Sequence, residues 1–221
     1  MIITLKSDIN NNELHNLKVY FESKNIKMKE IDSENDKQKM YLLVGPTYTL
    51  DEQSVLSLTG VLSCHRISKL YKLASRDYKE NDTIINVNGI KIGGKKIVFI
   101  AGPCSVENFE TVLNIGKVLK GVGVSILRGG AYKPRTSPYF FQGLKEEGLR
   151  ILSDVKEKLN MPVISEITDI CNIDEYDNVD IIQVGARNMK NYELLKALGR
   201  QNKPVMIKRS PDATIDELLL A

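Results

Sequence analysis

The chain has 221 residues, of which 42% are hydrophobic, so it can bury a core in one large domain or two smaller ones. Its 31 basic and 28 acidic residues are scattered and leave a formal net charge of +3, which excludes bulk attraction to nucleic acid as an explanation of function. The 3 cysteines, Cys64, Cys104 and Cys171, are an odd number at wide spacings, which argues against a disulfide framework and suits a reducing compartment.

Membrane and secretory signals are not found in the sequence. No apolar run approaches the roughly 18 residues that a membrane span needs, and Met1 to Thr4 do not form a signal peptide. We therefore expect a cytoplasmic protein whose partners include neither a membrane nor nucleic acid.

Residues 1–70 predict a small α+β domain. Leu14 and Leu17 lie at helical spacing behind asparagines that can cap a helix, and Asp51 can begin a second short helix that ends near Gly60. Apolar runs predict strands over residues 2–5, 27–31, 40–44 and 61–68. The order β-α-β-β-α-β is that of the ferredoxin-like arrangement, which we therefore expect here.

Residues 71–83 are polar and show no clear period, so we expect a linker and a domain boundary there. Residues 84–94 then predict two short strands around Asn88-Gly89. This dipeptide accepts the positive φ angles of a tight hairpin turn.

Residues 84–221 predict an α/β domain in which strands and helices alternate. Apolar runs predict strands over residues 97–100, 124–127, 162–167, 181–184 and 204–207. Helices are expected after them, the first with Val112, Ile115 and Leu119 on one face up to Gly121, the others over residues 142–159, 170–176, 192–198 and 215–221. About five βα units in succession favour a parallel sheet, and polar residues at the strand exits favour a TIM barrel. Because a complete (β/α)8 barrel needs eight units and about 250 residues, we expect this chain to be the C-terminally truncated, N-terminal part of a longer enzyme.

Cationic residues follow several of the predicted strands. The segment Leu127 to Pro138 carries Arg128, Lys133 and Arg135 among glycines, which let backbone approach a ligand, and prolines, which prevent a helix. Arg187 and the pair Lys208-Arg209 follow later strands. On barrel geometry these cations face one mouth, where a phosphorylated or carboxylated metabolite would offset their mutual repulsion. The alternative for any single cation is a solvated loop position, and recurrence at successive strand ends favours a site.

Two further strand-exit residues allow more than one interpretation. Cys104, in a Gly-Pro-Cys-Ser turn, can be a small buried residue or a ligand of a divalent metal. A metal would need histidine or carboxylate partners, and the only histidines, His15 and His65, lie in the first domain. Glu166 can be a structural partner of an arginine or a group that orients substrate, and both interpretations stay open.

Together these segments resemble the 3-deoxy-D-arabino-heptulosonate 7-phosphate (DAHP) synthases. The resemblance rests on Ile100-Ala101-Gly102-Pro103-Cys104-Ser105, on Leu127 to Pro138 with its Lys-Pro-Arg-Thr-Ser, on Gln183-Val184-Gly185-Ala186-Arg187-Asn188 and on Ile207-Lys208-Arg209. It points to the type I branch with a short N-terminal ferredoxin-like regulatory domain. It covers the whole chain and is strongest from about residue 84 onward.

The resemblance implies a transferase that condenses phosphoenolpyruvate with erythrose 4-phosphate and releases phosphate, the first step of the shikimate pathway to the aromatic amino acids. By motif, Arg128, Lys133, Arg187 and Lys208 would hold the carboxylate and phosphate of phosphoenolpyruvate, with Lys133 also near the reacting carbons. Arg135 and Thr136 would hold the phosphate of erythrose 4-phosphate. Cys104 would be one ligand of a divalent metal such as Mn²⁺. We take Lys133 and Glu166 as candidate catalytic residues.

The sequence also departs from the family. The remaining metal ligands of the family are a histidine, a glutamate and an aspartate from later strands, with one further phosphate-binding arginine, and none of these positions lies within the 221 residues. We therefore expect the isolated chain to lack synthase activity. Ser210-Pro211 stands where the family usually has glycine followed by a small or flexible residue, and the proline should rigidify this loop.

Two other functions stay open. The related 3-deoxy-D-manno-octulosonate 8-phosphate synthases have a similar Gly-Pro-Cys turn, although the Lys-Pro-Arg-Thr-Ser loop disfavours them. The chain could instead be a non-catalytic protein whose small domain senses an aromatic amino acid. Such a domain can also do no more than pair edges in a homo-oligomer, a dimer or a tetramer.

Overall fold

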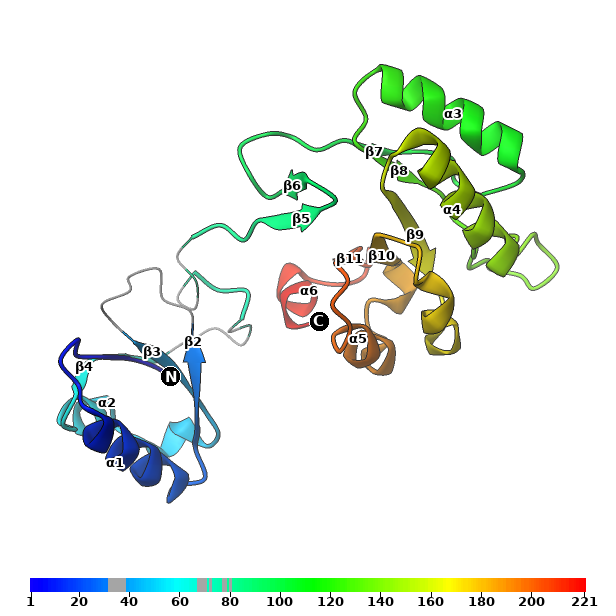
Figure 1. Ribbon diagram of the computed structural model, residues 1–221. Helices are drawn as coiled ribbons and strands as arrows, with labels where there is room; N and C mark the ends of the chain where they lie inside the picture. Colours follow the sequence, from blue (N-terminus) through cyan, green and yellow to red (C-terminus); the bar gives the residue numbers. More distant parts are fainter. Residues whose placement is uncertain (32–38, 67–70, 72, 77–78, 80) are drawn as a thin grey trace. The chain divides into compact units, whose positions relative to one another are not determined.

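The computed structural model describes residues 1–31, 39–66, 71, 73–76, 79 and 81–221. The chain divides into two compact units, Met1–Asn81 and Asp82–Ala221 (Figure 1). The predicted linker, residues 71–83, falls partly on residues outside this described set. No helix in the described ranges combines the length and the hydropathy that a membrane crossing requires.

The first unit is an antiparallel sheet with helices on one face. Its elements are β1 (Ile2–Leu5), α1 (Asn11–Glu22), β2 (Lys27–Ile31), β3 (Met40–Val44), the 3-10 helix η1 (Thr47–Thr49), α2 (Glu52–Leu56) and β4 (Val61–His65). The strand order β2-β3-β1-β4 and the antiparallel pairing are those of a ferredoxin-like sheet. The predicted order of elements is therefore confirmed.

Alternation along β1 and capping of α1 explain this arrangement. Ile3 and Leu5 point to the helix side, where Leu17 and Phe21 of α1 are buried against them. Asn10 begins α1 with a capping box. Its side chain accepts from the Glu13 backbone N–H, and the Glu13 carboxylate accepts from the Asn10 backbone N–H. Two predicted ends were wrong: α2 ends at Leu56 rather than near residue 60, and β4 ends at residue 65, with residues 67 and 68 outside the described part.

The second unit begins with a hairpin and continues as a parallel α/β unit. Its elements are β5 (Ile85–Val87), β6 (Ile90–Ile92), β7 (Ile100–Ala101), α3 (Phe109–Gly121), β8 (Ile126–Arg128), α4 (Glu146–Leu159), β9 (Val163–Ile167), η2 (Ile170–Tyr176), β10 (Ile181–Val184), η3 (Ala186–Asn188), α5 (Tyr192–Leu198), β11 (Val205–Ile207) and α6 (Ile215–Leu220). Strands β7 to β11 pair in chain order, all in parallel, as one 5-stranded curled sheet. This is the predicted α/β architecture of a partial TIM barrel.

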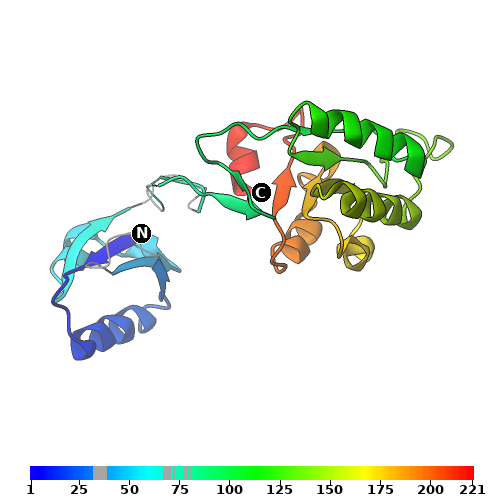
Figure 2. The ribbon, with the colours of Figure 1, turned by 45° about the horizontal axis from the view of Figure 1, so that its top comes forward.

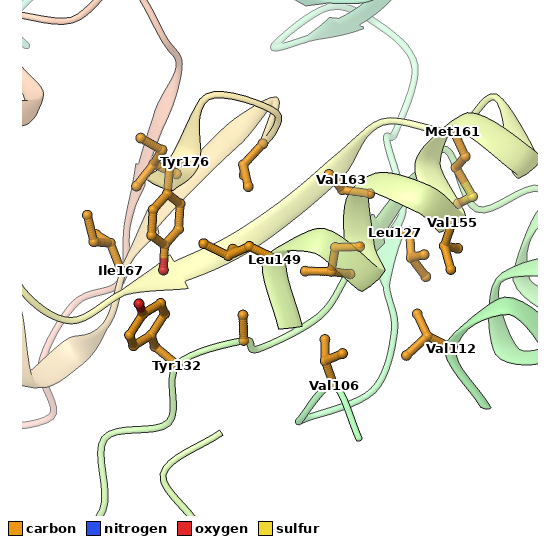
Figure 3. Close-up of a cluster of buried hydrophobic side chains, with 14 of the residues drawn as sticks. Val106, Val112, Leu127, Tyr132, Leu149, Val155, Met161, Val163, Ile167 and Tyr176 are labelled. Atoms are coloured by element: carbon orange, nitrogen blue, oxygen red, sulfur yellow. The ribbon is translucent and has the colours of Figure 1, made fainter. Parts of the chain in front are cut away.

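Helices cover one side of the curled sheet. Leu127 of β8 and Val163 of β9 pack against Leu149 and Val155 of α4 in the main core, to which α3 and α5 also contribute (Figures 1 and 3). Figure 2 shows the same helices from a second direction. Because side chains alternate along a strand, the residues between these core positions face the opposite, inner side of the sheet.

The amino end of the inner side is closed by the β5–β6 hairpin. Val87 is buried with Ile126, Ile164 and Ile181, which lie in β8, β9 and β10. Asn88 and Gly89 have φ angles of 48° and 88°, as the predicted hairpin turn requires. The inner side is therefore apolar near the amino ends of the strands, and its polar residues lie at the carboxyl ends.

Three predicted boundaries in this unit were wrong. The first strand begins at Ile100 rather than at residue 97. Ile97 and Phe99 are 81% and 61% exposed, although the Phe99 carbonyl accepts from the Ser125 N–H (3.0 Å). The second strand begins at Ile126, two residues after the predicted start at residue 124. Helix α4 begins at Glu146 rather than at residue 142, because the chain before it takes a non-helical course, with a φ of 55° at Lys145.

Candidate active site

Strand register places the polar residues of the inner side near the carboxyl ends of the strands. Glu166 of β9 is paired with Gln183 of β10, which is paired with Met206 of β11. Arg128, at the end of β8, pairs with Ile164 and so faces the same side as Glu166 two residues later. Lys208 follows Met206 at the same two-residue spacing. The carboxyl ends of four neighbouring strands thus direct Arg128, Glu166, Gln183 and Lys208 to one mouth.

The turn that contains Cys104 holds two of the cations. Arg128 Nη1 donates to the carbonyls of Pro103 (3.0 Å) and Cys104 (3.2 Å). Lys133 is only 8% exposed, and its ammonium donates to the Cys104 carbonyl (2.8 Å) and to Cys104 Sγ (3.2 Å). The Lys133 hydrogen bond, and then its charge, lower the pKa of the exposed Cys104 thiol. Cys104 is therefore exposed at the mouth, and its interpretation as a buried apolar residue is wrong.

The predicted anion-binding loop is closed at its base by backbone hydrogen bonds. Lys133 N–H donates to the Gln142 carbonyl (2.8 Å), and Lys145 N–H donates to the Ala131 carbonyl (2.9 Å). Gly143 allows this closure, since its φ is 90° and a Cβ there would lie 2.0 Å from the Ala131 carbonyl oxygen.

Side chains inside the loop fix its outer part. Gln142 Nε2 donates to the Phe140 carbonyl (2.9 Å), and Arg135 Nε donates to the Phe141 carbonyl (3.1 Å). The remaining guanidinium nitrogens of Arg135 and the side chain of Thr136 are at exposed positions of the loop. The loop therefore presents Arg135 and Thr136 to solvent from a closed frame.

The later strands add two more cations. Arg187 lies in η3, directly after β10, and its Nη1 donates to the Pro134 carbonyl (2.9 Å), so it reaches the loop that follows β8. Lys208 N–H continues the β10–β11 ladder to Val184 (2.9 Å), and its side chain is exposed. Within the described residues, none of the six predicted cations forms an ion pair with a carboxylate. Among the residues that the structure describes, these cations at the mouth are therefore not paired with carboxylates.

Glu166 lies beside the cations without pairing to one of them. Its carboxylate accepts from Gln183 Nε2 (3.3 Å) and lies against Gly185, where a Cβ would come within 1.8 Å of Glu166 Oε1. No ion pair joins it to an arginine in the part of the chain that the structure describes, so the structural alternative of an arginine partner is not supported. Its free carboxylate oxygen leaves it available to a ligand.

The residues present do not by themselves make a metal site. Among the described residues, no group of three or more His, Cys, Asp or Glu side chains comes together. A divalent ion held by sulfur and nitrogen or oxygen usually takes four protein ligands, or three and a water. Cys104, whose nearest polar side chain is the Lys133 ammonium, offers one.

The structure also brings together residues that sequence reasoning missed. Tyr132, the neighbour of Lys133, donates its hydroxyl to Glu175 in η2, and Asn172 bonds to both. Burial, and then Glu175, raise the pKa of Tyr132, so the phenol stays protonated as a donor. A pocket lies beside this group, lined by Tyr132, Lys133, Pro134, Gln142, Lys145, Thr168 and Asn172. These contacts join residues far apart in the chain, and no sequence signal points to them.

Comparison with known proteins agrees with this geometry. The family described as the DAHP synthetase I family matches residues 79–221. Phospho-2-dehydro-3-deoxyheptonate aldolase of Thermotoga maritima is 40% identical over 224 residues, which cover 100% of this chain and 65% of that protein. The chain therefore spans slightly less than two thirds of the length of this relative.

A second group of relatives matches a shorter part of the chain. The 2-dehydro-3-deoxyphosphooctonate aldolase of Citrifermentans bemidjiense is 37% identical over 134 residues, which cover 57% of this chain and 49% of that protein. The octonate aldolases thus share less of the chain than the heptonate aldolase does.

Solved structures show the same relationship. The crystal structure of the DAHP synthase of Thermotoga maritima superposes with a TM-score of 0.68 at 39% identity, covering 99% of this chain and 64% of that one. A truncated form of the same synthase gives a TM-score of 0.62 at 42% identity over 68% of this chain and 54% of that one. The barrel-like fold, the cations at its mouth and these matches agree. The chain belongs to the DAHP synthetase I family.

Proposed function

We propose that the mouth formed by β8 to β11 binds phosphoenolpyruvate, and that the protein condenses it with erythrose 4-phosphate to give DAHP and phosphate. The observation that carries the proposal is the set of cations at successive strand ends that form no ion pair within the described residues, with Lys133 held inward at 8% exposure. A substrate with a phosphate and a carboxylate supplies the negative charge that these cations lack. The proposed activity is the first step of the shikimate pathway.

Each cation has a proposed role that its position supports. Arg128, Lys133, Arg187 and Lys208 would bind the phosphate and carboxylate of phosphoenolpyruvate. Arg128 and Lys133 are already oriented by the carbonyls of the Cys104 turn, so little reorganisation accompanies binding. Fixed donors of this kind hold the reacting enol in place and neutralise charge that grows as the new carbon–carbon bond forms.

The second substrate is assigned to the closed loop. Arg135 and Thr136, exposed on a frame held by Gln142, would bind the phosphate of erythrose 4-phosphate. Glu166, at the same level as Gln183, would orient substrate from the opposite wall of the mouth. Lys133, two residues before Arg135 in the chain, is the proposed catalytic cation.

Several features of the whole protein are part of the same proposal. Cys104 would be one ligand of a divalent metal such as Mn²⁺, although the described residues do not complete the site. The first unit would be regulatory, with an aromatic amino acid as its effector, or would pair edges in a homo-oligomer, a dimer or a tetramer. We place the protein in the cytoplasm.

A substrate comparison tests the proposal. A form of the protein that contains this chain would be given phosphoenolpyruvate with either erythrose 4-phosphate or arabinose 5-phosphate, and phosphate release would be measured with added Mn²⁺. We expect release with erythrose 4-phosphate. A preference for arabinose 5-phosphate would instead indicate the octulosonate synthase, and binding of an aromatic amino acid without any turnover would indicate the non-catalytic alternative.

A further inference from the structure

Lys133 and its neighbour Tyr132 are both buried but take opposite directions. Each is 8% exposed. The Lys133 ammonium bonds to Cys104 at the mouth, whereas the Tyr132 ring joins the outer core beneath α4. The two consecutive side chains therefore diverge, the Tyr132 phenol toward η2 and the Lys133 ammonium toward the mouth.

Three side chains, which we call the η2 triad, hold Tyr132 from the outside. They are Tyr132, Asn172 and Glu175. Tyr132 donates its hydroxyl to Glu175 Oε2, and Asn172 Nδ2 donates to the Tyr132 hydroxyl oxygen (3.1 Å) and to Glu175 Oε1 (2.8 Å). Every member is therefore bonded to the other two, and the acceptor of the hydroxyl is charged, which makes the bond stronger than a neutral one.

A second tyrosine of η2 reaches a different part of the site. The Tyr176 ring stacks on Tyr132 with centroids 6.3 Å apart, and its hydroxyl donates to the Glu166 carbonyl (2.6 Å). Figure 3 shows the two rings with their hydroxyl oxygens turned toward each other, beside Ile167. Tyr176 thus touches the same core as Tyr132 but is bonded to β9 and not to the Glu175 carboxylate.

We propose that Glu175 is a positioning residue, which acts through the Tyr132 hydroxyl to hold the Lys133 ammonium at the mouth. The Lys133 backbone N–H is fixed by Gln142 (2.8 Å), and the η2 triad fixes the residue before it. The Lys133 side chain has no carboxylate partner among the described residues, so this backbone hold supplements the contacts to Cys104. The functional meaning of the proposal rests on Lys133 binding phosphoenolpyruvate, but the positioning itself does not.

The test compares two tyrosines that each lose only a hydroxyl. Tyr132→Phe removes the link to Glu175, and Tyr176→Phe removes a hydroxyl of the same core that is bonded to Glu166. Position is read from the rate at which Lys133 is reductively methylated in the 221-residue chain, followed by peptide mass spectrometry with the exposed Lys145 as internal standard. We expect Tyr132→Phe to raise the methylation rate of Lys133 about three- to tenfold, because one charge-assisted hydrogen bond is lost. We expect Tyr176→Phe to leave this rate within about twofold of that in the unmodified chain.

Glu175→Gln provides the second variant, because it keeps the shape of the side chain and removes its charge. We expect an intermediate rise in Lys133 labelling, and a parallel weakening of phosphoenolpyruvate binding in calorimetry. Unchanged Lys133 labelling in a folded Glu175→Gln chain overturns the positioning role, as does an equal rise in Tyr176→Phe, which would indicate general loosening. If the unmodified chain binds no phosphoenolpyruvate, the proposed function fails, and the labelling rates still decide whether Glu175 positions Lys133.

Discussion

Lys145 occupies a backbone conformation that suits glycine, and its replacement by glycine should stabilise the protein. Its φ and ψ are 55° and −127°. The other non-glycine residues with positive φ among those described are Asn25, Asn88 and Asn160, and asparagine tolerates this region best. A lysine there stores strain of about 1–3 kcal/mol.

The net effect of Lys145→Gly follows from two opposing terms. Relief of strain stabilises the folded state, while the greater freedom of glycine in the unfolded chain costs about 0.4–1 kcal/mol. Lys145 is exposed and its backbone bond to Ala131 (2.9 Å) is kept in the variant, so little else changes. We expect about 1 kcal/mol of stabilisation, which raises the Tm of the unit that contains it by about 2–4 °C.

Scanning calorimetry of Lys145→Gly beside Lys145→Ala tests this reasoning. Alanine removes the same charge and keeps the strain, so its Tm should stay close to that of the unmodified chain. A glycine variant that melts at or below the alanine variant would refute the strain argument, because the relief of strain is expected to exceed the cost of glycine's freedom in the unfolded chain.

The remaining predictions concern the mouth. Arg187→Ala should weaken phosphoenolpyruvate binding about tenfold or more in calorimetry, since one or more charge-assisted hydrogen bonds are lost. In an active form of the protein that contains this chain, Gly185→Ala should lower the rate of phosphate release at least about tenfold, because the new methyl would lie 1.8 Å from Glu166 Oε1 and must displace that carboxylate. Lys133→Met should raise the pH at which iodoacetamide half-maximally alkylates Cys104, since the lysine lowers the pKa of the thiol and so populates the thiolate at lower pH.

Each of these predictions has a control in the chain. For Arg187, the control is Lys196→Ala, which removes a surface cation paired with Glu193 (2.8 Å) and should leave affinity unchanged. For the glycine, it is Gly121→Ala, whose methyl would meet nothing within 4 Å. For Cys104, the reference is Cys171, whose pKa Asp169 raises, so it should react at higher pH in both proteins. Controls that change as much as the variants would contradict the assignments.

Most of the fold could be predicted from the periodicity of hydrophobic residues and from the polar residues that follow the strands. The strand Ile181 to Val184 is buried along its whole length, with Gln183 as its one polar residue, and its bounds match the apolar run in the sequence. The start of β7 was placed too early, at residue 97, since an apolar run alone does not reveal that Ile97 and Phe99 are largely exposed. Helix α4 was started too early, because Lys145 gives no sequence sign of its positive φ.

The charged residues of the site could be predicted from the sequence. The residues that only packing brings to the site could not. Arg128, Lys133 and Arg187 are recognisable because unpaired cations recur after strands. Tyr132 and Glu175 have ordinary places in the sequence, and only the fold brings them together across 43 positions. Long-range contacts of this kind follow from the register of β8 on β9, which one sequence does not specify.

Calorimetric titration of the 221-residue chain with phosphoenolpyruvate tests the central claim most directly. The cations proposed to bind it, Arg128, Lys133, Arg187 and Lys208, all lie in this chain. We predict one bound molecule per chain, with an affinity that falls markedly as salt is raised, because the mouth attracts its ligand by charge. Absence of binding at low salt, or binding that Arg187→Ala and salt leave unchanged, would contradict the account.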